Sequence, residues 1–344
     1  MLRVDSLEPR LIEALQPIRG FAFATTLYHF FETGLFDCLR DSELALGELA
    51  ERHGMDPARL EALLSFLQNE GILKQHEGRY GLTARGLGLE DFRGWYTMLV
   101  GGYGQTFLQM GERLQRGSPP ATRDAARVGV GSCAISYFDA IPLTRSLMAR
   151  IPGNPNRLLD LGCGNALYLA EFCTALPQVE AWGVEPDPEG YQAAVRVVRS
   201  RGLESRIRLT CSTALDFFRV VDTTYRPDFI VLGFVLHELL GQGGEAAVLE
   251  LLRGATERFQ GVHLIVIEVD QQMKNPRVMR HGLAMAYYNA YYLLHPFTQQ
   301  RLETRAFWDD LFARAGLEVL ARQDVDPSVD STGLEVGYLL RKKS

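Results

Sequence analysis

The most constraining stretch of this chain is RLLDLGCGN, residues 157–165. Its apolar first half predicts a buried strand. Its two glycines predict a tight turn, since glycine adopts positive φ and leaves room for a ligand beside the backbone. A helix is expected over residues 165–176, and then a second strand over 180–184 that ends in the acid Glu185. This order is typical of a nucleotide-binding βαβ unit, in which a carboxylate binds the ribose hydroxyls.

The turn differs from the one that binds dinucleotides. The third glycine of the dinucleotide fingerprint is replaced by Leu167, so the turn is expected to hold a smaller charged group than a pyrophosphate.

A later segment completes the pattern. The apolar run of residues 228–232 leads into Gly233-Phe234-Val235-Leu236-His237-Glu238. Together with Asp160 ahead of the glycines and Glu185 after the second strand, it resembles the class I S-adenosylmethionine (SAM) methyltransferases. Their first motif is similar to this Asp-Leu-Gly-x-Gly. The resemblance implies SAM as cofactor.

Strands and helices alternate from residue 156 onward, with strands expected near 157–161, 180–184, 207–211, 228–232, 263–268, 317–322 and 334–340. Such alternation predicts a mainly parallel sheet. The expected fold class is α/β, a Rossmann-like SAM-binding domain with a mainly parallel seven-stranded sheet, and the resemblance implies an inserted antiparallel last strand. Ligands bind such sheets at the carboxyl ends of the strands, near the reversal of strand order. The residues expected to bind SAM all fall at these ends: Asp160, Gly162, Gly164, Glu185, Ser212, Thr213, Gly233 and Phe234.

The chemistry of SAM suggests roles for these groups. An ionised carboxylate has two acceptor oxygens, so Glu185 is expected to bind both ribose hydroxyls. Asp160 and the glycine turn are expected beside the methionine amine, and Ser212 and Thr213 beside the adenine.

His237 and Glu238 are the candidate catalytic residues. An imidazole with a pKa near neutrality can remove a proton from a hydroxyl group or from an acidic carbon. The resembling O-methyltransferases have Leu-His-Asp here, with the histidine as general base, and Glu238 in place of the aspartate leaves the orienting role open. A purely structural His237 is the alternative.

A metal site is a further alternative. Some relatives that methylate 2-oxo acids at carbon hold a metal through such a His–acid pair and a later histidine. His295 or His281 could supply that ligand here. Because the spacing of these residues is loose, no metal is expected.

Aromatic residues of two other helices are candidates for the acceptor pocket. Residues 284–296 hold four tyrosines in i, i+4 pairs, whose rings can enclose the SAM sulfonium or pack in a core. A helix over residues 134–150, which follows a loop rich in Gly and Pro over 117–132, passes beside the cofactor in the resembling family. The pocket residues expected from both helices are Tyr137, Phe138, Tyr288, Asn289, Tyr292 and His295.

The first 94 residues have the pattern of a winged helix. Helices over 46–53 and 57–69, the second with Asp56 as N-cap, precede a two-stranded wing over 72–82, and a buried helix is expected over 20–39. This region has 10 Lys and Arg against 15 Asp and Glu, so it is expected to repel nucleic acid. In the resembling small-molecule methyltransferases, a winged helix of this kind forms the homodimer.

The expected organisation has three parts. They are a mostly helical winged-helix dimerisation domain (1–94), a helical connector (95–155) with a helix over 95–114, and the SAM-binding catalytic domain (156–344). The net charge of −6 argues against a nucleic-acid or membrane-surface role. No apolar run reaches the roughly 18 residues that span a bilayer. Five scattered cysteines fit reduced thiols in a cytoplasmic protein.

The expected function is a SAM-dependent methyltransferase of specialised metabolism that acts, as a cytoplasmic homodimer, on a small molecule. Among the resembling enzymes, those acting on small 2-oxo acids such as 2-ketoarginine look nearest. Two alternatives stay open. One is a SAM-consuming cyclase that closes the aminobutyrate arm to azetidine-2-carboxylate and releases methylthioadenosine. The other is a winged-helix regulator that senses SAM.

Overall fold

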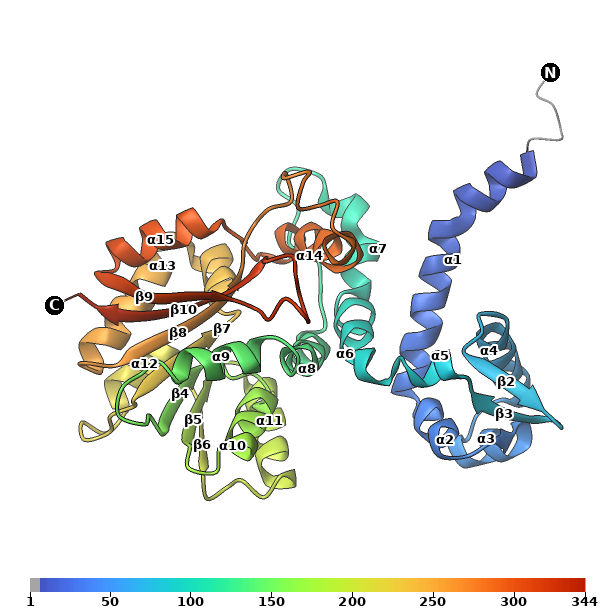
Figure 1. Cartoon of the computed structure of the whole chain (residues 1–344), viewed down its shortest axis with the longest axis horizontal. Helices are drawn as coiled ribbons and strands as arrows, with labels where there is room; N and C mark the ends of the chain where they lie inside the picture. The colour runs from blue at the N-terminus through green and yellow to red at the C-terminus, as the bar shows by residue number, and fades with distance from the viewer. Residues whose placement is uncertain (1–6, 344) are drawn as a thin grey trace. The chain divides into compact units, whose positions relative to one another are not determined.

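The computed structural model describes residues 7–343, and the chain forms two compact units that meet in the sequence between Gly102 and Tyr103 (Figure 1). Each unit has its own buried core. The finer division expected at residues 94 and 155 stays a prediction. Over residues 7–343 the structure contains no helix that is long and apolar enough to cross a membrane.

The first unit is helical and carries a small antiparallel sheet. Its helices are α1 (Leu7–Glu32), α2 (Leu35–Asp41), α3 (Leu46–His53), α4 (Pro57–Asn69), α5 (Ala84–Leu87), η2 (Glu90–Phe92), α6 (Arg93–Tyr96) and the π-helix η3 (Thr97–Gly102). Its strands are β1 (Leu44–Ala45), β2 (Leu73–His76) and β3 (Arg79–Leu82), in the order β1-β3-β2. The two expected helices and the wing are therefore confirmed, and the Asp56 side chain caps α4 by accepting a hydrogen bond from Arg59 N at 2.9 Å.

The buried helix expected over residues 20–39 is interrupted, which corrects the sequence prediction. Gly34 has φ +75° and separates α1 from α2, so the chain turns where the apolar periodicity alone predicted one continuous helix. Phe30 and Phe36, one from each helix, still pack at 5.8 Å between ring centroids. A shared core therefore explains why the periodicity runs across the break.

The second unit is built on a seven-stranded sheet in the order β6-β5-β4-β7-β8-β10-β9. Its strands are β4 (Arg157–Leu161), β5 (Glu180–Glu185), β6 (Ile207–Cys211), β7 (Phe229–Gly233), β8 (His263–Val269), β9 (Leu317–Asp324) and β10 (Glu335–Lys342). The pairing is parallel except for β10, which lies antiparallel between β8 and β9. This confirms the expected Rossmann-like class.

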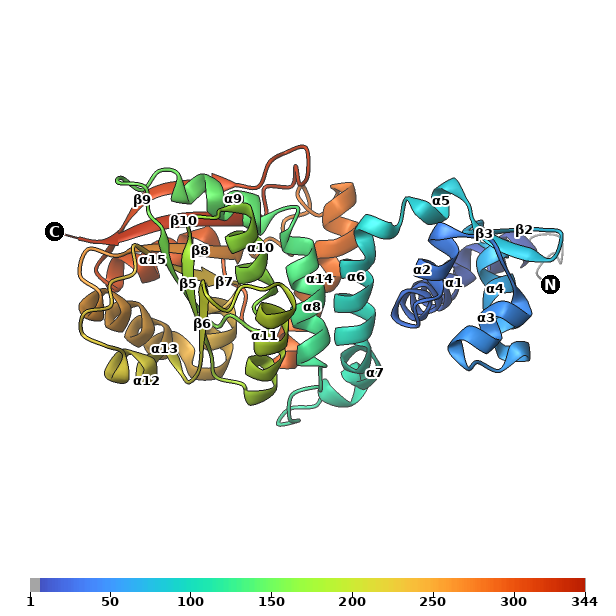
Figure 2. The same ribbon diagram turned by 90° about the horizontal axis from the view of Figure 1, so that it is seen from below.

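Helices cover both faces of this sheet, as Figures 1 and 2 show. One face is covered by α9 (Ala140–Met148), α10 (Leu167–Ala175) and α11 (Pro188–Ser200), and the other by α12 (Ala214–Val220), α13 (Leu236–Arg258) and α15 (Arg305–Arg314). The unit also contains α7 (Gly104–Arg113), α8 (Ala125–Ser136), η4 (Ala284–Tyr288), α14 (Asn289–Leu294) and η5 (His295–Thr298). Successive residues of a strand point to opposite faces of the sheet and so pack into two different hydrophobic cores. Ile230 packs with α12, α13 and α15, whereas Val231 packs with α9, α10 and α11. Burial on both faces explains why the strands read as continuous apolar runs.

The segment between the two units differs from its prediction. The helix expected over 95–114 is divided into α6, η3 and α7, and the loop expected over 117–132 ends at Asp124. The Asp124 side chain caps α8 by accepting from Arg127 N at 3.0 Å, so a helix begins inside the Gly-rich segment. The helix expected over 134–150 is likewise split, because Asp139 caps a new helix, α9.

Candidate active site

The carboxyl ends of β4, β5 and β7 lie together at the edge of the sheet where the active site is expected (the catalytic edge). The strand order reverses at β4 and β7, which pair in parallel, and such a switch point opens a crevice for a ligand. Asp160 lies near the end of β4, Glu185 ends β5 and Gly233 ends β7. The structure thus places these three predicted residues at one edge of the sheet.

The turn after β4 depends on its glycines. Gly162 has φ +82°, and a Cβ atom there would lie 2.9 Å from Cγ2 of Val235. Gly164 has φ +53° and donates its N–H to Oε2 of Glu185 at 2.7 Å. The helix begins two residues later than expected, at Leu167, with Ala166 also at positive φ. The turn and the acid of the second strand therefore form one rigid unit.

Glu185 is buried and held in one orientation. Its Oε1 accepts from Asp187 N at 2.9 Å, and Oε2 accepts from Gly164 N. Burial raises its pKa, and these two backbone hydrogen bonds act against the rise. Each oxygen keeps a second lone pair that can accept a ligand hydroxyl. Asp160 is also buried, and burial together with the Glu185 charge raises its pKa to about 7.

Asn165 adds a polar group that the sequence interpretation did not use. Its Oδ1 accepts from Leu167 N at 3.2 Å. Its Nδ2 is buried, and no acceptor among residues 7–343 reaches it. Since an unpaired buried donor is costly, this amide fits a ligand acceptor placed beside the turn.

The remaining residues expected to bind SAM border the same edge. Ser212 N donates to the Glu185 carbonyl at 3.0 Å, and the Thr213 hydroxyl caps α12 by accepting from Asp216 N. Phe234 has φ +58°, an uncommon conformation for a residue with a side chain. Its N–H donates to Ile267 O at 2.9 Å, which ties the end of β7 to β8.

His237 lies at the start of α13 and is fully enclosed, with 2% of its surface exposed. Its Nδ1 lies 2.9 Å from Oε2 of Glu268, and its backbone N–H donates to Oε1 of the same carboxylate at 3.1 Å. A carboxylate has no proton to donate, so the proton of the first contact lies on Nδ1. Neutral His237 then has its lone pair on Nε2, which lies 3.5 Å from Nε2 of Gln300. Burial alone would lower the pKa of His237, but the Glu268 carboxylate outweighs burial and the pKa is raised.

Glu268, and not Glu238, therefore orients the histidine. Glu268 lies near the end of β8 and is completely buried. Its only sequence signal is one acid within the otherwise apolar strand HLIVIEV.

Glu238 belongs to a separate network beside the imidazole. Its Oε1 accepts from Arg123 at 2.9 Å and from Gln300 Nε2 at 2.8 Å. Tyr103 donates its hydroxyl to Gln300 Oε1 at 3.1 Å. Burial would raise the pKa of Glu238, but the Arg123 guanidinium holds it below its usual value. Glu238 thus stays ionised, and the network places a cation near His237.

His295 packs against His237, with ring centroids 5.2 Å apart. Its Nδ1 lies 2.6 Å from the Tyr291 carbonyl, and burial together with the nearby His237 lowers its pKa well below the usual value. His281 instead lies 3.0 Å from the Ser331 hydroxyl. Within residues 7–343, no group of three or more His, Cys, Asp or Glu side chains is placed to hold a metal ion.

The predicted pocket residues occupy different environments. Tyr288 donates its hydroxyl to Asp330 at 2.5 Å, and Tyr292 donates to the Asp270 carbonyl at 2.5 Å. Asn289, between them, is half-buried. Tyr137 is 61% exposed, and its ring packs on Phe138 at 5.7 Å. The structure therefore brings the tyrosines of η4 and α14 and His295 together, while Tyr137 faces solvent in this chain.

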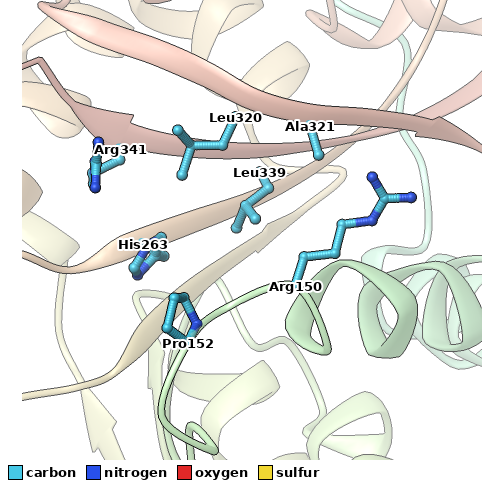
Figure 3. Close-up of a pocket in the computed structure, with 7 residues that line it drawn as sticks. All are labelled: Arg150, Pro152, His263, Leu320, Ala321, Leu339 and Arg341. Carbon is cyan, nitrogen blue, oxygen red and sulfur yellow. The ribbon is translucent and has the colours of Figure 1, made fainter.

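A pocket of about 320 Å³ lies elsewhere on the second unit (Figure 3). It is lined by Arg150, Pro152, His263, Leu320, Ala321, Leu339 and Arg341. His263 begins β8, whereas Glu268 lies near its end, so this pocket opens at the opposite edge of the sheet. None of the predicted site residues lines it.

Comparisons with known proteins agree with this geometry. Residues 15–87 match the O-methyltransferase dimerisation domain and residues 137–322 match a methyltransferase domain family. The chain is 44% identical to 2-ketoarginine methyltransferase of Streptomyces arginensis, over 98% of both chains. It is 27% identical to 3-hydroxy-5-methyl-1-naphthoate 3-O-methyltransferase of Streptomyces sahachiroi, over 62% of this chain and 65% of the relative.

Solved structures share the fold. The crystal structure of human N-acetylserotonin methyltransferase in complex with SAM superposes with a TM-score of 0.69 at 16% identity and covers 100% of both chains. Neither a SAM cyclase nor a SAM-sensing regulator finds support among these relatives.

Proposed function

This chain belongs to the SAM-dependent small-molecule methyltransferases that carry an N-terminal dimerisation domain, and on that premise we propose that its acceptor is a 2-oxo acid bearing a guanidino group. The proposal rests on the 44% identity of this chain to 2-ketoarginine methyltransferase, which extends over 98% of both chains. The buried His237–Glu268 pair supports it, because methylation at the carbon beside a ketone requires a base.

The residues of the catalytic edge fit SAM. Glu185 offers two fixed acceptor oxygens for the ribose hydroxyls, and the orphaned Asn165 amide offers a donor for the methionine carboxylate. The buried Asp160 carboxylate suits the methionine amine. When bound, SAM supplies an electrophilic methyl group on a sulfonium, which is transferred by in-line displacement. Ser212, Thr213, Gly233 and Phe234 are assigned to the remaining border of the site.

His237 is assigned as the general base. Its Nε2 lone pair takes the proton from the acceptor carbon next to the ketone, and the electron pair of that C–H bond forms the bond to the methyl carbon. The Glu268 carboxylate stabilises the imidazolium that results, since it accepts from Nδ1 in both protonation states.

Arg123 is assigned to the carboxylate of the 2-oxo acid. Its guanidinium is largely buried, with 18% of the side chain exposed, and one nitrogen bonds Glu238. The other N–H donors of the fork can bind a carboxylate in the bidentate manner that arginine favours. Glu238 and Gln300 then act as positioning residues for the arginine.

The pH dependence of turnover tests the His237–Glu268 pair. Because the pKa of His237 is raised, the unprotonated base gains population only as the pH rises through a value above the ordinary 6.5 of histidine, and kcat should rise with it. Glu268→Gln removes the charge that raises this pKa while burial continues to lower it. The acid limb of the kcat profile should therefore move to lower pH by about one to two pH units, with a lower plateau. An unchanged limb in the variant would contradict the assignment.

The acceptor is tested with the purified full chain. Incubation with SAM and a panel of 2-oxo acids and phenols, read by mass spectrometry, should give S-adenosylhomocysteine with 2-ketoarginine and leave phenols unmethylated. NMR of the product should place the methyl group on the carbon beside the ketone. Methylation of the phenols alone, or release of methylthioadenosine without an acceptor, would contradict the proposal.

A homodimer is proposed from the first unit. The N-terminal part of α1 exposes six large apolar side chains, each 46–64% exposed: Leu7, Leu11, Ile12, Leu15, Ile18 and Phe21. The matched dimerisation family and this apolar helix support association between two copies. Light scattering should give twice the chain mass, and a monomer at micromolar concentration would argue against it. A cytoplasmic location and the lack of a nucleic-acid partner stay predictions.

A further inference from the structure

Three acidic side chains meet beside the catalytic edge without having been part of the expected site. Asp139 begins α9, Asp330 lies in the loop between β9 and β10, and Glu335 begins β10. They are 9%, 6% and 4% exposed. The carboxyl groups of Asp139 and Glu335 contact each other, and Asp330 is close enough to raise the pKa of both.

The protein itself supplies little compensation for this charge. Asp139 accepts from its neighbour Ala140 N at 2.5 Å, and Asp330 accepts from Thr332 N at 2.8 Å and from the Tyr288 hydroxyl. No donor of the described chain reaches Oε1 of Glu335, although that atom is buried. No arginine, lysine or histidine within residues 7–343 forms an ion pair with any of the three acids.

Uncompensated buried carboxylates are costly, so a cluster of them favours the uptake of protons or of a cation. Burial raises the pKa of Asp139 to about 7 and that of Glu335 well above its usual value. A ligand cation with N–H groups that enters the cluster would replace these protons and donate hydrogen bonds to the unsatisfied lone pairs of the carboxylates.

Aromatic rings form one wall of the cluster. Tyr287 and Tyr288 have ring centroids 4.9 Å apart, and Tyr287 and Tyr291 lie at 5.7 Å. The charges of Asp139 and Glu335 both act on the Tyr287 hydroxyl. Carboxylates that can accept a planar fork of N–H groups, next to tyrosine faces, are the surroundings that a guanidinium group prefers.

A row of rings joins this cluster to the candidate base. Tyr291 follows Tyr287, His295 lies 3.9 Å from Tyr291, and His237 lies 5.2 Å from His295, all measured between ring centroids. The charges of both Glu268 and Glu335 act on the Tyr291 hydroxyl, so this side chain lies near the partner of the base and near the acidic cluster. An extended acceptor could therefore place its reacting carbon at His237 and a cationic end among the acids.

We infer that Asp139, Asp330 and Glu335, with the ring of Tyr287, form the binding site for the guanidinium group of the acceptor. The inference rests on the proposed function. It separates substrate choice from methyl transfer: the acids select the cationic end, while His237 and Arg123 act at the 2-oxo acid end.

The test compares two acceptors of the same shape, 2-ketoarginine and its uncharged ureido counterpart, the 2-oxo acid of citrulline. Wild-type enzyme should have the higher kcat/KM for the guanidino acid. Glu335→Gln should lower kcat/KM for that acceptor by about 10- to 100-fold, mainly through KM, and leave the value for the ureido acid within about twofold. The affinity for SAM, measured by calorimetry, should not change. Asp326→Asn, which removes an exposed charge from the same loop, serves as the matched control and should behave as wild type.

The guanidinium site and the proposed acceptor can be tested separately by calorimetry, which measures the binding of 2-ketoarginine to protein loaded with S-adenosylhomocysteine. Binding that Glu335→Gln weakens, without methylation by the wild type, would support the guanidinium site and overturn the proposed acceptor. Methylation of both acids with equal kcat/KM in wild type and Glu335→Gln would overturn the guanidinium site and leave the 2-oxo acid function standing. A loss of SAM affinity in Glu335→Gln would assign the cluster to the cofactor and overturn the inference.

Discussion

The variant His237→Asn is expected to lose about 10²- to 10⁴-fold in kcat and to keep its affinity for SAM within about twofold. The asparagine amide can take the place of ring Nδ1 and donate to Glu268, so the buried carboxylate keeps a partner. Nothing replaces Nε2, which is the atom assigned to accept the proton. Stopped assays of turnover together with calorimetry of SAM binding measure the two effects separately.

The matched control is His263→Asn, a histidine at the opposite edge of the sheet. It should retain wild-type turnover. If His237→Asn turns over like the control, His237 is a structural residue and the proposed mechanism loses its base.

The second large effect is expected for Glu185→Ala, which should weaken SAM binding by about 10- to 100-fold. The variant removes both oxygens assigned to the ribose hydroxyls, and it also removes the acceptors of Gly164 N and Asp187 N, which hold the glycine turn in place. Calorimetry gives the affinity, and kcat at saturating SAM should fall much less than kcat/KM for SAM.

Glu189→Ala provides the comparison, because Glu189 is exposed and lies in the first turn of the following helix, α11. An unchanged SAM affinity in Glu185→Ala would show that the ribose is held elsewhere and would contradict the assignment of the catalytic edge to SAM.

The sheet could be predicted from the sequence because both of its faces are buried. The central strands β4, β7 and β8 are short, buried and mainly apolar runs. Over all seven strands the expected and observed limits differ by at most two residues, as in β9 (317–322 expected, Leu317–Asp324 observed). The limits of several helices in the first 150 residues could not be predicted in this way. Gly34, Asp124 and Asp139 end or begin helices through backbone conformation and side-chain caps, which apolar periodicity does not encode.

Some residues of the candidate site could likewise be predicted from the sequence, and others could not. The glycine turn, Glu185 and His237 lie in contiguous motifs and could be located from them. Glu268, Gln300 and Arg123 could not, because they come from segments far apart in the sequence that only the tertiary structure joins. Gly233 at the end of β7 pairs with Ile267, so the next residue of β8, Glu268, is brought beside the loop that carries His237.

The central place of β10 between two earlier strands means that the sheet can finish folding only at the end of synthesis. Residues 335–342 come last among the strands, yet they pair with β8 along one side and β9 along the other. During synthesis, β8 and β9 therefore lack their shared neighbour until the ribosome has passed residue 342 and the exit tunnel has released the segment. Two strand edges stay exposed to other chains over that interval. Glu335, at the start of the same strand, arrives with it, so the enzyme acquires its last acceptor-binding group only in the step that closes the sheet.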